Sequence, residues 1–170
     1  MKKISDYIGN ELLIIQKSFW KKEFELLAGD EIISRLYYPK FFGDMAELSV
    51  RDEIYEFYKP RFFSREVDIR KKGYQNPIAH FKNNFWRSRG ILELPRGIRL
   101  NIKFRYFRKQ AEIYLGDEDL LVSILNKFSL KERCKVVIEK RSEIIDEYPW
   151  LIMLGFYLAQ LMKRNSAAGS

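Results

Sequence analysis

Apolar and polar residues alternate along most of this chain in short runs that turn residues separate. The clearest run covers 98–107, and its apolar face consists of Ile98, Leu100, Ile102, Phe104 and Tyr106. Strict alternation with a period of two is typical of an antiparallel strand with one buried face. The segment is therefore predicted to be a strand whose outer face carries Arg99, Lys103 and Arg105.

Further runs of strand character are bounded by turn residues such as Gly, Pro, Asn and Asp. They cover residues 19–27, 31–38, 44–49, 53–59, 65–71, 77–82, 89–94, 111–115, 119–127 and 133–139. No long crossover helix lies between them, so a parallel sheet is not expected. The even spacing predicts a mainly β protein, a meander of about twelve antiparallel strands in a sandwich or barrel.

The C-terminal segment departs from this pattern. Between Trp150 and Met162, every face of a helix would be apolar apart from Gln160. Acidic residues precede the segment and Lys163-Arg164 follow it, an order that suits a helix dipole. At about 1.5 Å per residue the helix spans about 20 Å, less than the ~30 Å hydrocarbon core of a bilayer. We predict a helix over 148–164 that is buried inside a ring of strands; a short interfacial or tail-anchor helix is the alternative.

The two ends of the chain bound a single predicted domain, 1–165. Apolar residues recur at helical spacing near the start, at Ile4, Ile8, Leu12 and Ile15. This spacing predicts a short helix within 1–16, and residues 166–170 are expected to be a tail outside the fold. The longest early apolar run is too short for a secretory signal. We therefore expect a cytoplasmic protein, with a peripheral membrane location as a further option.

Three short segments accompany this layout. They are Trp20–Leu27 with Gly29-Asp30-Glu31, Asp68-Ile69-Arg70 with Gly73, and Tyr148-Pro149-Trp150 with Gly155-Phe156-Tyr157-Leu158. A long meander followed by one apolar helix resembles the tubby-like C-terminal domain in the broad sense, and the short segments resemble its bacterial LURP-one-like members. The resemblance implies a closed antiparallel barrel of about twelve strands around a buried hydrophobic C-terminal helix.

The same resemblance implies a class of function. The group includes tubby proteins, which bind phosphoinositide head groups through basic surface residues, plant LURP-one-related proteins, and phospholipid scramblases. The Cys-rich segment and the Pro-rich N-terminal stretch of scramblases are absent from this chain. The resemblance therefore implies a non-catalytic binding module rather than a scramblase, and it transfers no individual lysine or arginine.

Charge is distributed unevenly along the chain. The protein has 31 Lys and Arg against 23 Asp and Glu. Residues 59–109 hold fifteen of the bases and only three acids, whereas all other residues hold sixteen bases and twenty acids. A basic middle third of this kind favours a polyanionic partner.

The candidate anion-binding residues are bases of this middle third that are predicted on an outer face or in a turn. They are Arg70, Lys71, Lys72, Arg87, Arg89, Arg96, Arg99, Lys103 and Arg105. The first three are expected at a turn, where side chains and free backbone N–H groups can both meet a phosphate. A hairpin through Pro95-Arg96-Gly97 is expected to gather Arg89, Arg96 and Arg99, whose guanidinium groups suit phosphate oxygens.

Several functions remain open at this point. The favoured one is a binding module for anionic phospholipid head groups or a membrane surface. The alternative is a scaffold for an acidic protein or a nucleic acid, which would need exposed aromatic rings beside the bases; Phe107 is one candidate. The simplest interpretation is a solvated basic surface without a ligand. The sequence does not indicate an oligomeric state.

An enzyme is the weaker hypothesis. His80 and Cys134 are the only residues of their types, and each is expected to be structural, with Cys134 in the core. The spacing of the His, Cys and acidic residues does not predict a metal site, and no nucleophile elbow, phosphate-binding loop or dinucleotide motif is present. The acidic run Asp117-Glu118-Asp119 is predicted to be a hairpin turn. No cofactor, metal or catalytic residue is therefore predicted.

Overall fold

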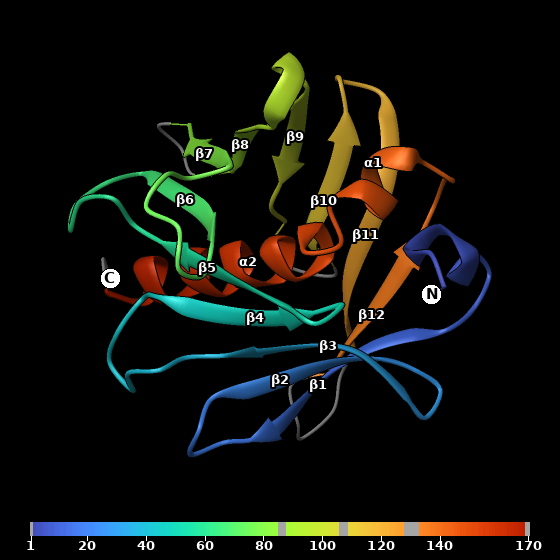
Figure 1. Ribbon diagram of the computed structural model, residues 1–170, viewed down its shortest axis with the longest axis horizontal. Helices are drawn as coiled ribbons and strands as arrows, with labels where there is room; N and C mark the ends of the chain where they lie inside the picture. The colour runs from blue at the N-terminus through green and yellow to red at the C-terminus, as the bar shows by residue number, and fades with distance from the viewer. Residues whose placement is uncertain (1, 85–87, 106–108, 128–132, 169–170) are drawn as a thin grey trace.

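The chain folds as a closed β-barrel with a helix inside it (Figure 1). The structure is a computed structural model that describes residues 2–84, 88–105, 109–127 and 133–168. Its strands are β1 (Leu12–Ser18), β2 (Glu23–Ala28), β3 (Glu31–Tyr37), β4 (Ala46–Val50), β5 (Glu53–Tyr58), β6 (Glu66–Lys71), β7 (Ala79–Asn83), β8 (Arg89–Glu93), β9 (Arg99–Lys103), β10 (Lys109–Leu115), β11 (Asp119–Lys127) and β12 (Arg133–Ile138). Its helical segments are the 3-10 turns η1 (Ile4–Tyr7) and η2 (Pro95–Gly97), and the helices α1 (Glu143–Glu147) and α2 (Leu151–Ala168).

Every strand pairs antiparallel with the strands before and after it in the chain. β1 closes the ring by pairing with both β2 and β12, in a register that places Leu12 opposite Ala28 and Val136. The predicted mainly β fold with a closed antiparallel barrel is thus confirmed. In a closed meander, all connections from odd to even strands lie at one end of the barrel and all connections from even to odd strands at the other.

The alternation of the sequence determines which side chains face inward. In β9, Leu100 and Ile102 are fully buried, whereas Arg99 is exposed and Lys103 half-buried. The inward row continues through the buried Phe104. Tyr106 and Phe107 lie outside the described residues. The outer face therefore holds the charged side chains of this strand, as the period of two predicts.

The predicted N-terminal helix within 1–16 is wrong. Only Ile4–Tyr7 form a helical turn, and Leu12–Ser18 form β1. Gly9, with a φ of 80°, adopts a left-handed conformation that ends the turn. Leu12 and Ile14 are fully buried on the inner face. A strand is favoured here because it satisfies the backbone edges of both β2 and β12, which a helix could not do.

Two further boundaries differ from the prediction. The strand predicted from Phe19 begins at Glu23, because residues 19–22 form a turn in which Lys22 has a φ of 45°. The C-terminal helix continues to Ala168, so part of the expected tail is helical. Ala is the best helix former, which explains the extension. The short helix α1 was not predicted; Ser142 caps it by accepting a hydrogen bond from the Ile144 N–H.

The buried C-terminal helix is confirmed. From Trp150 to Met162 every residue is buried except Gln160, which is half-buried. Gly155 permits close packing, since a Cβ there would lie 3.1 Å from Ile124 Cδ1 and 3.2 Å from Ile113 Cδ1. The Tyr157 hydroxyl donates a hydrogen bond of 2.6 Å to the Asp44 carbonyl oxygen. The apolar helix thus supplies the barrel with a packed core.

Candidate functional site

The three consecutive bases of β6 and its end are all engaged with carboxylates of the neighbouring strands. Arg70 pairs with Glu56 at 2.5 Å, Lys71 with Glu53 at 2.5 Å and Lys72 with Glu47 at 2.9 Å. Arg70 also lies 4.4 Å from the centroid of the Tyr58 ring. The Lys72 N–H donates to the Ile54 carbonyl. Lys72 lies in the turn after β6 as expected, but its N–H is not free, and Arg70 and Lys71 belong to the paired strand β6, which corrects that part of the expectation.

The hairpin between β8 and β9 forms through Pro95–Gly97 as predicted, but it does not gather the three arginines. Arg89 begins β8 and is paired in register with Lys103 at the end of β9, whereas Arg99 is paired with Glu93 near the hairpin. Arg96 forms an ion pair of 2.5 Å with Glu147. Antiparallel pairing separates the two ends of β8 by about 3.4 Å per residue. The expected cluster of Arg89, Arg96 and Arg99 is thus wrong.

A different basic cluster does form at the other end of this hairpin. Arg89 and Lys103 face outward directly opposite each other, and Arg105 follows two residues after Lys103. Lys103 Nζ lies 4.3 Å from the centroid of the Tyr114 ring. Arg105 lies 3.4 Å from Glu112. The buried Glu112 stands opposite Lys103 on β10 and contacts Arg105, and Arg89 lies opposite Lys103 on the other side of β9. Arg87 lies outside the described residues.

Buried carboxylates on the outer wall neutralise much of the predicted excess of basic residues. Glu25, Glu47, Glu56 and Glu112 are each less than a tenth exposed, although they point away from the core. Burial by itself raises the pKa of the Glu47 carboxyl, but hydrogen bonds from Tyr37 and Lys72 and the charge of Lys72 outweigh it and keep the pKa below its usual range. The bases of one strand thus neutralise the acids of the next.

The remaining candidates for chemistry are His80 and Cys134. His80 Nδ1 lies 2.7 Å from Asp68 Oδ1 on the outer wall. A hollow of about 790 Å³ beside this pair is lined by Lys82 and Arg89 but also by Glu66, Asp68, Glu93 and Asp117, so its lining does not suit an anion. Cys134 is buried, as predicted. No group of three potential metal ligands occurs among the described residues.

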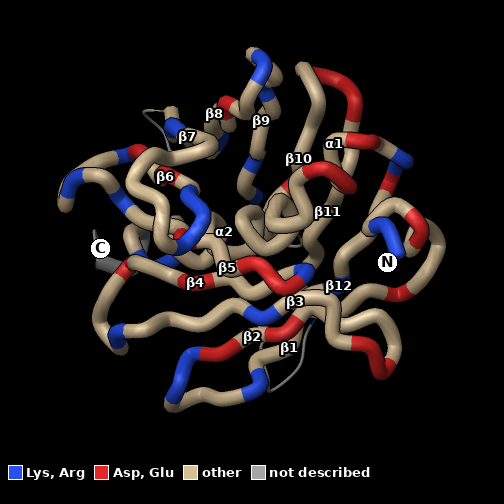
Figure 2. The backbone as a smooth tube through the Cα atoms, in the orientation of Figure 1, with Lys and Arg blue, Asp and Glu red and all other residues tan. Residues whose placement is uncertain are grey.

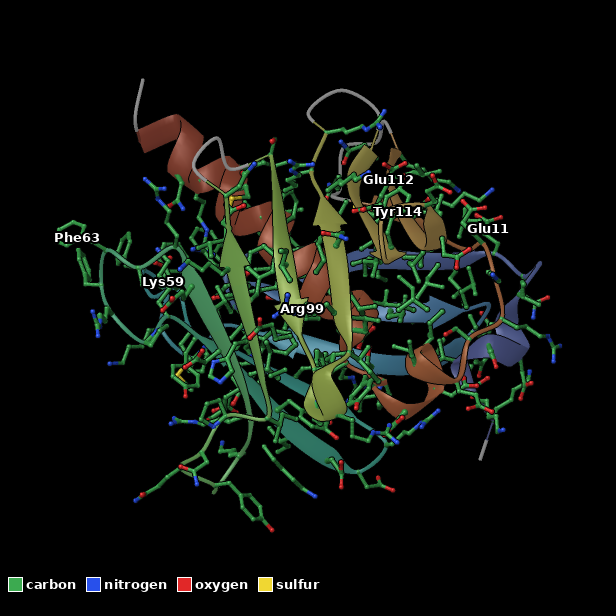
Figure 3. All side chains as sticks on the ribbon, turned by 90° about the horizontal axis from the view of Figure 1, so that it is seen from above. Glu11, Lys59, Phe63, Arg99, Glu112 and Tyr114 are labelled. Atoms are coloured by element: carbon green, nitrogen blue, oxygen red, sulfur yellow. The ribbon has the colours of Figure 1, made fainter. Side chains whose placement is uncertain are left out.

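One feature of the described surface was not predicted at all. Adjacent aromatic residues stand in three connections at the same end of the barrel, namely Phe19-Trp20, Phe41-Phe42 and Phe62-Phe63. In Figure 3, Phe63 projects from the left edge of the molecule, near Lys59. Once strand boundaries are known, the sequence shows this repetition. The pairs were missed because Phe19 and Trp20 were assigned to a strand.

A mainly antiparallel barrel of twelve strands closed around a buried C-terminal helix defines the tubby-like fold, which confirms the resemblance expected from the sequence. Comparison with solved structures gives a neighbour, a protein from Arabidopsis thaliana described as AT5G01750. The TM-score is 0.58 at 12% identity, over 87% of this chain and 88% of that chain. At this identity the match shows the fold alone.

Two other comparisons found nothing: no family model matches the chain, and no curated protein matches its sequence. Within the described residues, none of the helices combines the length and the apolarity that crossing a membrane requires.

Proposed function

We propose that this protein is a non-catalytic binding module for the phosphate-bearing head groups of an anionic phospholipid surface, which it contacts through Arg89, Lys103 and Arg105. The observation that carries the proposal is the cross-strand register, which places Arg89 directly opposite Lys103 on the outer wall. The non-catalytic part rests on the tubby-like fold, which suggests a binding module.

Like charges directly opposite each other on a sheet destabilise it. Elsewhere on this barrel a base usually stands opposite or beside a carboxylate, as Lys72 does with Glu47. Near Arg89 and Lys103, the buried Glu112 stands opposite Lys103 and lies 3.4 Å from Arg105, whereas Arg89 is one strand further from it. A phosphate group would offset the repulsion between Arg89 and Lys103, and the guanidinium of Arg89 can bind two phosphate oxygens at once.

The other predicted bases are assigned to the lipid contact or to the stability of the barrel wall, according to how strongly each is paired with a carboxylate. Arg99 and Arg105 are well exposed, and each lies 3.4 Å from a carboxylate, which is the exposed Glu93 for Arg99 and the buried Glu112 for Arg105. An exposed pair such as Arg99–Glu93 contributes about 0–1 kcal/mol. Arg105 can contact a phosphate while it stays beside Glu112, because a guanidinium group has five N–H donors. Arg70, Lys71 and Lys72 hold shorter pairs with wall carboxylates. We assign these three to the stability of the wall and Arg105 to the edge of the lipid contact; Arg99 stands near the β8–β9 hairpin, toward the other end of the barrel.

The experiment is co-sedimentation with phosphatidylcholine vesicles, with and without phosphatidylserine or a phosphoinositide, at low and at physiological salt. The test variant is Arg89→Gln/Lys103→Gln, because Gln removes charge without setting a second carboxylate beside Glu112. Each basic residue near an anionic surface contributes about 1 kcal/mol, so binding to anionic vesicles is expected to fall more than about tenfold.

The matched control is Lys140→Gln/Arg141→Gln, which removes the same charge at the other end of the barrel, where Lys140 is exposed. Its binding is expected to stay within about twofold of the wild type. Equal losses of vesicle binding in both variants would mean that binding depends on net charge alone. Absence of wild-type binding to anionic vesicles, together with a log-linear salt dependence on nucleic acid, would replace the lipid proposal with the scaffold alternative.

A further inference from the structure

The end of the barrel at which odd strands lead into even strands exposes aromatic rings in a repeated arrangement. The β1–β2, β3–β4 and β5–β6 connections carry Phe19 and Trp20, Phe41 and Phe42, and Phe62 and Phe63. Phe42 and Phe63 are more than 90% exposed, and Trp20 is 81% exposed. We call these three connections, with the last turns of α2, the aromatic end. Figure 1 shows them along the left side, where the C-terminus also lies.

The rings of the aromatic end do not fill gaps in the core. Within each pair they contact each other edge to face, with centroids 5.9 Å apart for Phe19 and Trp20, and 4.8 Å apart for Phe62 and Phe63. Apolar surface exposed to water at this scale is unusual unless it binds something. In the sequence, Phe85-Trp86 and Tyr106-Phe107 stand between the strands of the next two hairpins; they lie outside the described residues.

The same end is strongly basic. Residues 19–22, 38–45, 59–65 and 163–164 contain eight Lys and Arg and one acid, Asp44. The connections of the opposite end, 29–30, 51–52, 72–78, 94–98, 116–118 and 139–150, contain five bases and eight acids. Figure 2 shows Lys and Arg on the left-hand loops and the acidic stretches of the loops mostly on the right. The barrel is therefore polarised along its length.

Cations crowd together at the aromatic end. Arg164 and Lys59 share Asp44, at 3.6 Å and 3.1 Å. Burial and then the positive charge of Arg164 lower the pKa of Lys22, whose ammonium donates to the Phe41 carbonyl oxygen. Such crowding is unfavourable in the isolated protein, and a negatively charged surface would relieve it.

Two hollows open between the aromatic loops and the end of α2. One, of about 320 Å³, has Lys59 and Arg65 beside Phe63, with Leu161 and Met162 from the helix in its lining. The other, of about 190 Å³, is lined by a set that includes Phe19, Phe41, Lys22 and Arg164. Each hollow thus combines apolar side chains, which suit the acyl chains of a phospholipid, with cationic groups, which suit its phosphate head group.

We propose that the aromatic end docks end-on onto an anionic bilayer, with the six rings entering the interface between head groups and acyl chains and the adjacent Lys and Arg at the level of the phosphates. Aromatic rings with basic residues beside them are the side chains that favour this interface. Three separate convex loops suit a soft bilayer better than a protein surface, which would need matching pockets. The inference rests on the proposed function for the anionic class of lipid, but it depends on different residues.

The proposed head-group site lies toward the same end of the barrel as this surface. Arg89 begins β8 and Lys103 ends β9, so both lie toward the aromatic end of the barrel. End-on docking would hold the two cations just above the phosphate plane while the loops enter the interface. The basic wall and the aromatic loops would then act on the same leaflet, and their contributions to binding would add.

The test compares two variants in flotation with phosphatidylcholine vesicles that contain phosphatidylserine. Phe42→Ser/Phe63→Ser removes two loop rings without touching the core. Tyr74→Ser/Ile91→Ser is the matched control, since Tyr74 (62% exposed) is in the β6–β7 connection and Ile91 (43% exposed) is in the middle of β8. The loop variant is expected to bind at least about tenfold more weakly, and the control within about twofold of the wild type.

A second readout reports insertion directly. Phosphatidylserine vesicles with lipids brominated near the head group are expected to quench the fluorescence of the wild type more than that of Trp20→Phe, because the lost signal belongs to Trp20 in the interface. If the loop variant binds like the wild type and the two proteins are quenched equally, docking by the aromatic end is wrong.

The outcomes separate this inference from the proposed function. Normal vesicle binding by Phe42→Ser/Phe63→Ser, together with loss of binding by Arg89→Gln/Lys103→Gln, would overturn end-on docking and leave the head-group proposal standing. Loss of binding in the loop variant alone would support end-on docking and overturn the assignment of Arg89 and Lys103. No wild-type binding to any anionic vesicle would overturn both.

Discussion

The two ends of this barrel are built differently. At the end where even strands lead into odd strands, η1 and α1 lie together and are joined by hydrogen bonds; we call this the capped end. The Ser5 N–H and hydroxyl both donate to the Asp146 carboxylate, and Arg51 donates to the Asp146 carbonyl. At the aromatic end, rings of three connections extend into solvent instead. Both ends close the same barrel around the same helix.

Among the described residues, adjacent pairs of exposed aromatics occur at the aromatic end, whereas the capped end exposes the single Tyr74. At the capped end, polar and charged groups find partners within the chain, as Arg96 does with Glu147 and Tyr7 with Glu31. At the aromatic end, large apolar side chains are exposed to water. Residues that stabilise the fold and residues proposed to bind a membrane therefore occupy opposite ends, and the predictions below test that division.

The largest expected effect comes from removing the element that both ends share. A chain that stops at Pro149 would lose the helix, with Trp150, Tyr157 and the other buried side chains up to Met162. Each large apolar side chain contributes about 1.5–3 kcal/mol by burial, and a whole domain is stable by only about 5–15 kcal/mol. The truncated protein is expected to be insoluble. A soluble product with a cooperative thermal transition would contradict the buried-helix architecture.

A smaller effect is expected from breaking the capped end. Asp146→Ala leaves the donors of Ser5, which is 5% exposed, without their acceptor. An unsatisfied buried donor costs about 1–3 kcal/mol, so the free energy of unfolding measured in urea should fall by that amount.

The comparison for this variant is Phe42→Ser at the aromatic end. Because Phe42 is 94% exposed, its replacement is expected to change the unfolding free energy by less than about 0.5 kcal/mol. Vesicle binding should be weakened by Phe42→Ser and should stay near the wild-type level for Asp146→Ala. A strongly destabilised Phe42→Ser would show that the aromatic loops serve the fold, and the division between the two ends would be lost.

The smallest expected effect concerns pH. Burial, followed by the hydrogen bond and the charge of Glu31, raises the pKa of Tyr7 at the capped end to about 12. Because the folded state holds this proton more tightly than the unfolded state, the stabilisation is complete below pH ~10 and is lost as the pH rises toward about 12. Between these values, unfolding free energy should fall more steeply for the wild type than for Tyr7→Phe. Parallel curves would mean that Tyr7 does not contribute.

Much of the barrel could be predicted from local pattern. The alternation around Leu100 and Ile102 placed those side chains inward, and the apolar run from Trp150 to Met162 predicted its own burial. The N-terminal strand could not be identified in this way, because Leu12 fits a helical spacing with Ile8 and Ile15 as well as an alternating spacing with Ile14. Only the need of β2 and β12 for a partner decides in favour of a strand.

The candidate site could be predicted only in part. The sequence correctly located the excess of bases in 59–109. It could not show that Arg70, Lys71 and Lys72 meet carboxylates from β4 and β5, because those partners are 14 to 25 residues away in the chain. Ion pairs across strands depend on register, and register is fixed by the whole sheet.

The sequence by itself determined the antiparallel strands, the closed barrel suggested by the resemblance, the buried helix and the total charge. Only the tertiary structure decided which bases are neutralised by carboxylates of neighbouring strands and which loops lie at the same end of the barrel. The physical reason is that side-chain direction follows from neighbours in the chain, whereas neutralisation and clustering follow from neighbours in space. Arg89 and Lys103 become a cluster, and Phe42 and Phe63 part of one surface, only when the ring of strands closes.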